Sequence, residues 1–107
     1  GRGPVDLVHD GTNLWVATNW RHLVSKMNSN GELLGEYLVG AWPMAIAYDG
    51  ATIWVASYGD DSVVRLDLEG KEIGTFSTGR NPIAIEAIAG SIWIANFGDN
   101  SLTKITS

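Results

Sequence analysis

Apolar residues in this chain gather in short runs that are separated by polar residues and glycines. In the middle of the chain four such runs follow one another, at 44–48, 53–57, 63–67 and 72–77. Their lengths and boundaries predict four β-strands, which we call strands a to d. The pair Asp49-Gly50 lies between the first two runs, where it favours a tight hairpin turn. Because no segment shows helical periodicity over a useful length, the pattern predicts an all-β fold.

The four-strand pattern repeats every 39 residues, and no insertion breaks the interval. Pro4, Pro43 and Pro82 keep this interval, and so do Trp15, Trp54 and Trp93. The chain divides into units 1–40, 41–79 and 80–107, of which the last stops before its strand d. A four-stranded antiparallel unit of about 40 residues is typical of a β-propeller blade. We therefore expect one partial propeller domain of about 2.75 blades.

Strand b distinguishes a propeller from a β-sandwich. The segment Ile53-Trp54-Val55-Ala56 is apolar on both faces, whereas a sandwich strand alternates between apolar and polar residues. A blade covered by neighbours on both sides requires apolar residues on both faces. The tryptophan of strand b is accordingly predicted to lie in the core of every blade. Each proline is expected at the first residue of strand a, where its missing N–H costs no ladder hydrogen bond.

Three blades cannot close a ring, because propellers close with about four to eight blades. The apolar flanks of the first and last blades would then stay open, which is typical of an interface. One interpretation is a homodimer in which two copies form a six-bladed ring. The alternative is that the 107 residues are a portion of a longer single-chain propeller, for example a purely structural repeat segment of a surface protein. The missing strand d leaves an edge that another chain could complete.

Composition and charge exclude several classes of function. Twelve acidic and seven basic side chains give a net charge of −5, which argues against nucleic acid as a partner. The absence of cysteine excludes disulfides, thiolate zinc sites and thiol catalysis. The sequence contains no run of about 18 apolar residues, so no membrane span is predicted. Catalytic, metal-binding and phosphate-binding motifs are also absent, so we predict no cofactor and no motif-based metal site.

The runs PMAIAYDGATIWVAS and IWIANFGDNSLTKI resemble bacterial propeller repeats of the NHL, YncE-like and virginiamycin B lyase-like group. This resemblance covers essentially the whole chain and implies the propeller fold and an extracellular or periplasmic location. It implies no single activity, because fold alone does not define function. The lyase-like members carry a histidine after the strand a proline, and Val5, Met44 and Ile83 stand there in this chain. An enzyme of lyase or hydrolase type, with a metal held at the axis by several blades, is the alternative function.

The loops that join strands d to a and b to c are expected on one face of the propeller. The first unit carries Trp20-Arg21-His22 where its sister units carry Gly-Asp-Asp and Gly-Asp-Asn. We predict that this face binds an anionic or aromatic small molecule, or an acidic peptide. An alternative is that the aromatic residues cap the core and the acidic residues form turns. The candidate ligand-binding residues are Trp20, Arg21, His22, Trp42, Tyr58, Asp60, Arg80, Phe97 and Asp99.

Two acidic residues, Asp6 and Glu86, fall on strand a, which lines the axis of a propeller. Asp6 is expected either to face the central channel or to be a hydrogen-bonded acid near the rim. The two histidines, His9 and His22, occupy non-equivalent positions, one at the end of strand a and the other in a b–c loop.

Overall fold

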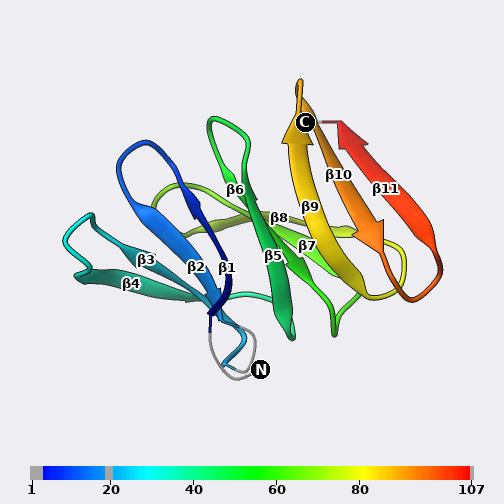
Figure 1. Ribbon diagram of the computed structural model, residues 1–107, viewed down its shortest axis with the longest axis horizontal. Coiled ribbons are helices and arrows are strands. Elements are labelled where there is room, and N and C mark those ends of the chain that lie inside the picture. The colour runs from blue at the N-terminus through cyan, green and yellow to red at the C-terminus, as the bar shows by residue number, and fades with distance from the viewer. Residues whose placement is uncertain (1–3, 19–20, 107) are drawn as a thin grey trace.

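The computed structural model describes residues 4–18 and 21–106, which form eleven strands in three antiparallel sheets (Figure 1). The first sheet contains β1 (Pro4–His9), β2 (Leu14–Thr18), β3 (Leu23–Met27) and β4 (Leu33–Leu38). The second contains β5 (Pro43–Tyr48), β6 (Ile53–Ser57), β7 (Ser62–Leu66) and β8 (Glu72–Ser77). The third contains β9 (Pro82–Ile88), β10 (Ser91–Asn96) and β11 (Ser101–Thr106). The predicted all-β blades are confirmed, and we call these sheets the first, second and third blades.

Strand boundaries agree closely with the hydrophobic pattern. The prolines begin β1, β5 and β9 as predicted, and β6 and β8 span the predicted residues. The third run was predicted at 63–67, but β7 begins at Ser62 and ends at Leu66. Asp67 leaves the strand because its Oδ1 accepts hydrogen bonds from the backbone N–H groups of Glu69 and Lys71, both at 2.9 Å. This bonding closes the c–d turn.

The blades stack face to face, with the innermost strands β1, β5 and β9 side by side (Figure 1). Between the first and second blades the buried side chains include Trp15, Ile53 and Val55. Between the second and third blades Trp54 packs with a second apolar cluster that includes Ile92. Each tryptophan of these two junctions therefore points from its own blade toward the next blade along the chain.

Burial differs between the blades in the way that stacking requires. All five residues of β6 are buried, so the middle blade is covered on both faces. In β2 and β10 only alternate residues are buried, because each outer blade has one neighbour. The tryptophan prediction is confirmed for Trp15 and Trp54, which are fully buried, but Trp93 is partly exposed on the uncovered face of the third blade.

The two outer blades each have one uncovered face, and we call these faces the leading flank and the trailing flank. The leading flank is the face of the first blade away from the second and carries Leu7, Leu14 and Val16. The trailing flank is the face of the third blade away from the second and carries Ala84, Glu86, Trp93, Ala95, Leu102 and Lys104. Within the described part of the chain there is no helix with the length and apolar character needed to cross a membrane.

Candidate functional site

The d–a and b–c loops lie on one face and are joined by backbone hydrogen bonds. Tyr58 N donates to the Trp42 carbonyl at 2.8 Å, and Phe97 N donates to the Asn81 carbonyl at 3.0 Å. On the other side of the first d–a loop, Val39 N donates to the His22 carbonyl at 3.0 Å. Each d–a loop is therefore held between the b–c loop of the preceding blade and that of its own blade.

Two candidate carboxylates bind the backbone of this loop face. Asp60 Oδ2 accepts a hydrogen bond from Ala41 N at 2.8 Å, and Asp99 Oδ2 accepts one from Arg80 N at 3.2 Å. The hydrogen bond from the Ser101 hydroxyl, followed by that from Arg80 N, lowers the pKa of Asp99. Both carboxylates position the loops, and both remain exposed to solvent.

His22 has a role in the loop framework that the sequence did not reveal. Its Nδ1 accepts a hydrogen bond from Trp42 N at 3.0 Å, as Asp61 Oδ1 accepts one from Asn81 N at 2.8 Å in the next blade. His22 and Asp61 also share a left-handed backbone, with φ of 57° and 52°. The histidine thus replaces an aspartate in the same contact, although the two residues look unrelated in sequence.

The remaining candidates are the aromatic residues of the loops and Arg21. The rings of Trp42 and Tyr58 lie with centroids 5.9 Å apart and planes 53° apart, and Trp42 and Phe97 are 51% and 66% exposed. Arg21 instead forms an ion pair of 3.8 Å with Glu36 on β4, toward the outer edge of its own blade. Trp20 lies outside the described residues. The structure therefore brings together His22, Trp42 and Tyr58, and separately Arg80 and Asp99, and it directs Arg21 elsewhere.

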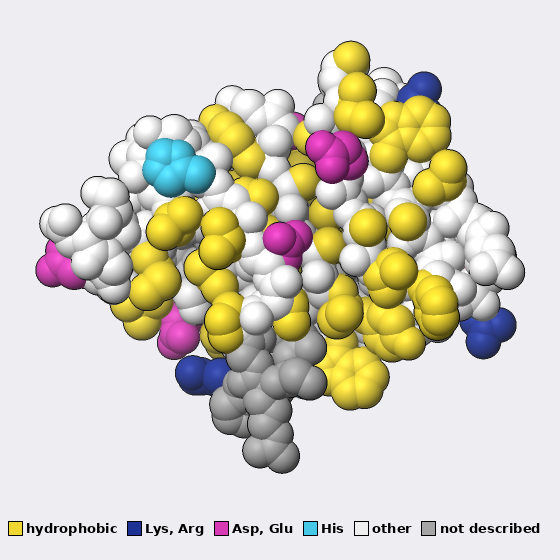
Figure 2. All heavy atoms as spheres, in the orientation of Figure 1, with side chains coloured by type: hydrophobic (Ala, Val, Ile, Leu, Met, Phe, Trp, Pro, Cys, Tyr) yellow, Lys and Arg dark blue, Asp and Glu magenta, His cyan; other side chains and the backbone are white. Residues whose placement is uncertain are grey.

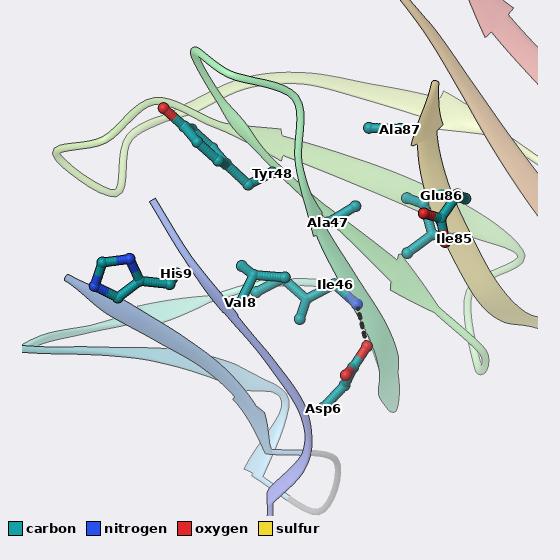
Figure 3. Close-up of a pocket in the computed structure, with 9 residues that line it drawn as sticks. All are labelled: Asp6, Val8, His9, Ile46, Ala47, Tyr48, Ile85, Glu86 and Ala87. Carbon is teal, nitrogen blue, oxygen red and sulfur yellow. Dashed lines mark hydrogen bonds between the residues drawn. The ribbon is translucent and has the colours of Figure 1, made fainter. Parts of the chain in front are cut away.

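A cavity lies at the axis, between the innermost strands of the three blades (Figure 3). This cavity has a volume of about 440 Å³. Asp6 lines it, and its Oδ2 accepts a hydrogen bond from Ile46 N of the second blade at 3.1 Å. His9 and Glu86 also line the cavity, and His9 Nδ1 accepts from Gly11 N at 3.1 Å. Among residues 4–18 and 21–106, no group of three His, Asp or Glu side chains is placed to hold a metal ion.

A smaller cavity of about 180 Å³ opens on the trailing flank, and we call it the flank socket. Its lining residues are Ala84, Ile85, Glu86, Trp93, Ala95 and Leu102. Apolar side chains also gather at the surface over β9, β10 and β11 (Figure 2). The sequence pattern did not predict this socket, although aligning Leu102 with the buried Val24 and Val63 would have suggested it.

Comparison with solved structures defines the class of protein. Hydrazine synthase from Kuenenia stuttgartiensis is similar with a TM-score of 0.91 and 26% identity over 99% of this chain. A catalytically inactive virginiamycin B lyase from Staphylococcus aureus, solved with quinupristin, has a TM-score of 0.83 and 23% identity over the whole chain. The computationally designed Ika8 protein has a TM-score of 0.80 at 11% identity over 96% of the chain. No protein-family model and no curated protein matches the sequence.

These similarities establish three blades of a β-propeller as the class of structure. The chain covers 33% of the hydrazine synthase chain, 39% of the lyase chain and 33% of the designed chain. It therefore spans between one third and two fifths of these neighbours.

Proposed function

We propose that this chain is a ligand-binding propeller scaffold of the NHL, YncE-like and virginiamycin B lyase-like group, and that a second copy completes a six-bladed ring. The observation that supports this assembly is that apolar residues on the two flanks are exposed, whereas residues at the same repeat positions in other blades are buried. Leu102 on the trailing flank is 68% exposed, whereas its counterparts Val24 and Val63 are fully buried. Leu7 on the leading flank is 57% exposed, whereas its counterpart Ile46 is 3% exposed.

Burial of these flanks supplies the driving force for association. Apolar surface removed from water contributes about 25 cal/mol per Å² to stability. Two copies give six blades, which lies within the usual range of about four to eight, while three copies exceed it. The mass of the particle tests this proposal directly. We expect twice the chain mass of 11.5 kDa by light scattering at micromolar concentration, and a folded monomer contradicts it.

The ligand is proposed to bind on the d–a and b–c loop face. Support comes from the exposed rings of Trp42 and Phe97 beside the hydrogen-bonded loops that carry Arg80. Aromatic rings provide large contact areas, and a guanidinium binds carboxylates through paired N–H groups. An aromatic carboxylate or an acidic peptide segment is therefore the class of ligand that this face suits.

Replacement of Trp20-Arg21-His22 by Gly-Asp-Asp tests whether the b–c loop of the first blade belongs to the ligand site. An aspartate at position 22 can accept the hydrogen bond from Trp42 N, as Asp61 does for Asn81 N, so the loop is expected to keep its conformation. Calorimetric titration with 4-hydroxybenzoate and with a hexaglutamate peptide should detect binding to the parent and weaker binding to the variant, which keeps Trp42, Arg80 and Phe97. Parent and variant should share the same mass and melting temperature. Equal binding by both proteins would remove this loop from the site, and loss of the dimer would assign it to the subunit contact.

A further inference from the structure

We infer that the two copies associate head to tail, with Leu7, Leu14 and Val16 on the leading flank of one copy filling the flank socket of the other. This inference rests on the proposed self-association and specifies its register. A propeller is built by repeating one blade-to-blade contact, and the chain itself contains that contact twice. The contact between copies is then a third instance, made from residues at the same repeat positions.

The junction between the second and third blades is the template. There Trp54 and Val63 pack against Ile92 and Ile94, and Ile85 packs at the edge of the same cluster. Trp93 and Leu102 stand on the trailing flank at the positions of Trp54 and Val63. The leading-flank counterparts of Ile85, Ile92 and Ile94 are Leu7, Leu14 and Val16. Both halves of the contact are therefore present in one chain, on opposite sides of it.

The flank socket has the character of an unfilled junction. Its residues Ala84, Ala95 and Leu102 correspond to Ala45, Ala56 and Val63, which are buried in the middle blade. The socket has a volume of about 180 Å³, and apolar side chains make up most of its lining, so aliphatic side chains suit it. Leu7, Leu14 and Val16 provide aliphatic side chains of the required kind on the leading flank.

A lysine contact supports the same register. Lys26 Nζ donates to the Leu68 carbonyl at 2.6 Å and so joins the first blade to the second. Lys104 occupies the same repeat position in the third blade, and its Nζ lies 5.2 Å from the centroid of the Trp93 ring, as Lys26 Nζ lies 5.2 Å from that of Trp15. In the head-to-tail register, Lys104 reaches the carbonyl of Ser29 of the second copy, which is the counterpart of Leu68.

The register also provides a partner for Glu86. This side chain is exposed in the single chain, and the second copy would cover it. Glu86 takes the repeat position of Val8, and His9 takes that of Tyr48. Val8 and Tyr48 lie on the adjacent strands β1 and β5 and line the axial cavity together (Figure 3). Glu86 of one copy is therefore placed beside His9 of the other, where an imidazole N–H can donate to the carboxylate.

Association of two trailing flanks would be unfavourable by comparison. It would leave Glu86 and Lys104 without the His9 and Ser29 partners that the head-to-tail register gives them. It would also leave both flank sockets without the side chains that fill them. A contact between unlike surfaces closes into a ring when the rotation between subunits allows it, and six blades provide that closure.

Two substitutions on opposite flanks test the register. Leu102→Asp damages the socket, Leu7→Asp damages the surface that enters it, and each protein alone is expected to be monomeric at micromolar concentration. A one-to-one mixture still contains one undamaged junction, formed by the Leu7 of one protein and the socket of the other. The mixture is therefore expected to give a dimer in sedimentation velocity, with at least tenfold tighter association than either variant alone. Ile73→Asp is the matched control, because Ile73 is 47% exposed on β8 of the middle blade, away from both flanks.

The outcomes separate the register from the self-association itself. If the parent is a dimer but the mixture stays monomeric, the head-to-tail register is overturned. It is also overturned if Leu7→Asp alone dimerises as well as the parent, since that result requires contact between two trailing flanks. A monomeric parent overturns self-association and the register with it. Far-UV circular dichroism checks that each variant is folded, and Leu7→Gln with Leu102→Gln repeats the experiment should an aspartate unfold the chain.

Discussion

At the scale of single residues, each buried tryptophan is fixed by polar partners on two sides. Trp54 Nε1 donates to Asp49 Oδ2 at 2.8 Å, and the Arg65 guanidinium lies 4.9 Å from the ring centroid. Trp15 Nε1 has the same bond to Asp10, also at 2.8 Å. A large ring with a satisfied N–H and a cation over its face packs in one orientation. The tryptophan interval in the sequence therefore reflects a repeated packing unit.

Truncation of these rings should have position-dependent effects. We expect Trp54→Ala to lower the free energy of unfolding by about 3–5 kcal/mol, because it removes a fully buried ring. Trp93→Ala should cost less in a monomeric Leu102→Asp background, where the flank of the third blade is uncovered. Urea unfolding of the two variants measures the difference. Equal losses would show that Trp93 is as well packed in the single chain as Trp54, contrary to the assignment of open flanks.

Asp49 should make stability depend on pH in the acid range. Burial raises the pKa of this carboxyl, but hydrogen bonds from Trp54 Nε1 and from the backbone and hydroxyl of Thr52 outweigh burial, so the pKa lies below its ordinary value. A lowered pKa stabilises the fold above the pKa of the unfolded chain, about 3.9, and this contribution is lost as the pH falls through the lower folded value. Asp49→Asn should therefore lose less stability than the parent between pH 5 and pH 3.

Urea unfolding at several pH values measures this dependence. Glu69→Gln, a change at an exposed turn position, serves as the control and should follow the parent. A parallel loss of stability in Asp49→Asn and the parent would exclude Asp49 as a source of the acid sensitivity.

Some residue roles could be predicted from the sequence and others could not. The aspartate–glycine turns were predicted, and positive φ falls on Gly11 and Gly50 at 97° and 98°. The framework role of His22 was not predicted, since an imidazole nitrogen and a carboxylate oxygen are interchangeable acceptors only in one particular geometry.

At the scale of elements, close approach between neighbouring segments explains the repeated glycines of the d–a loops, Gly40 and Gly79. A Cβ on Gly40 would lie 2.7 Å from Asp60 Oδ2 and 2.8 Å from Ser57 Cβ, and Ser57 is fully buried. Gly79 approaches the next b–c loop in the same way, because a Cβ there would lie 2.8 Å from Asn96 Nδ2. Glycine is required at these two positions because a side chain would collide with its neighbours, and not because the backbone has a positive φ. The 39-residue interval in the sequence did not distinguish these two reasons.

Substitution of Gly40 tests this close contact. Gly40→Ala should lower the free energy of unfolding by about 1–3 kcal/mol, because the added methyl group displaces the loop that Asp60 holds. Glu69→Ala at an exposed turn should change stability little. The urea midpoint reports both values. A Gly40→Ala protein as stable as the parent would mean that the b–c loop yields without cost.

At the scale of the whole molecule, the sequence predicted blade stacking and an axial position for Asp6, but it did not predict the flank socket. The two-sided apolar pattern of 53–56 identified a strand covered on both faces, and the structure confirms it. The flank socket is open because no further blade covers the trailing flank. The pattern of apolar residues in the sequence would be the same with or without such a blade, so it did not reveal the socket. The axial cavity depends on side chains such as Asp6 and Glu86 converging from different blades, which a single repeat does not encode.

Thermal unfolding should test the proposed ring, because unfolding of a dimer also separates its subunits. Mass action then stabilises the folded dimer as the total concentration rises. Raising the concentration about 40-fold adds about 2.2 kcal/mol per dimer, which should raise the melting temperature by about 5 °C. The monomeric Leu102→Asp protein should melt at one temperature throughout, since none of its folded contacts depends on a second copy. Scanning calorimetry at both concentrations gives the comparison. A parent melting temperature that does not move with concentration would mean that the exposed Leu7 and Leu102 stay in solvent, and that a second copy does not cover the flanks.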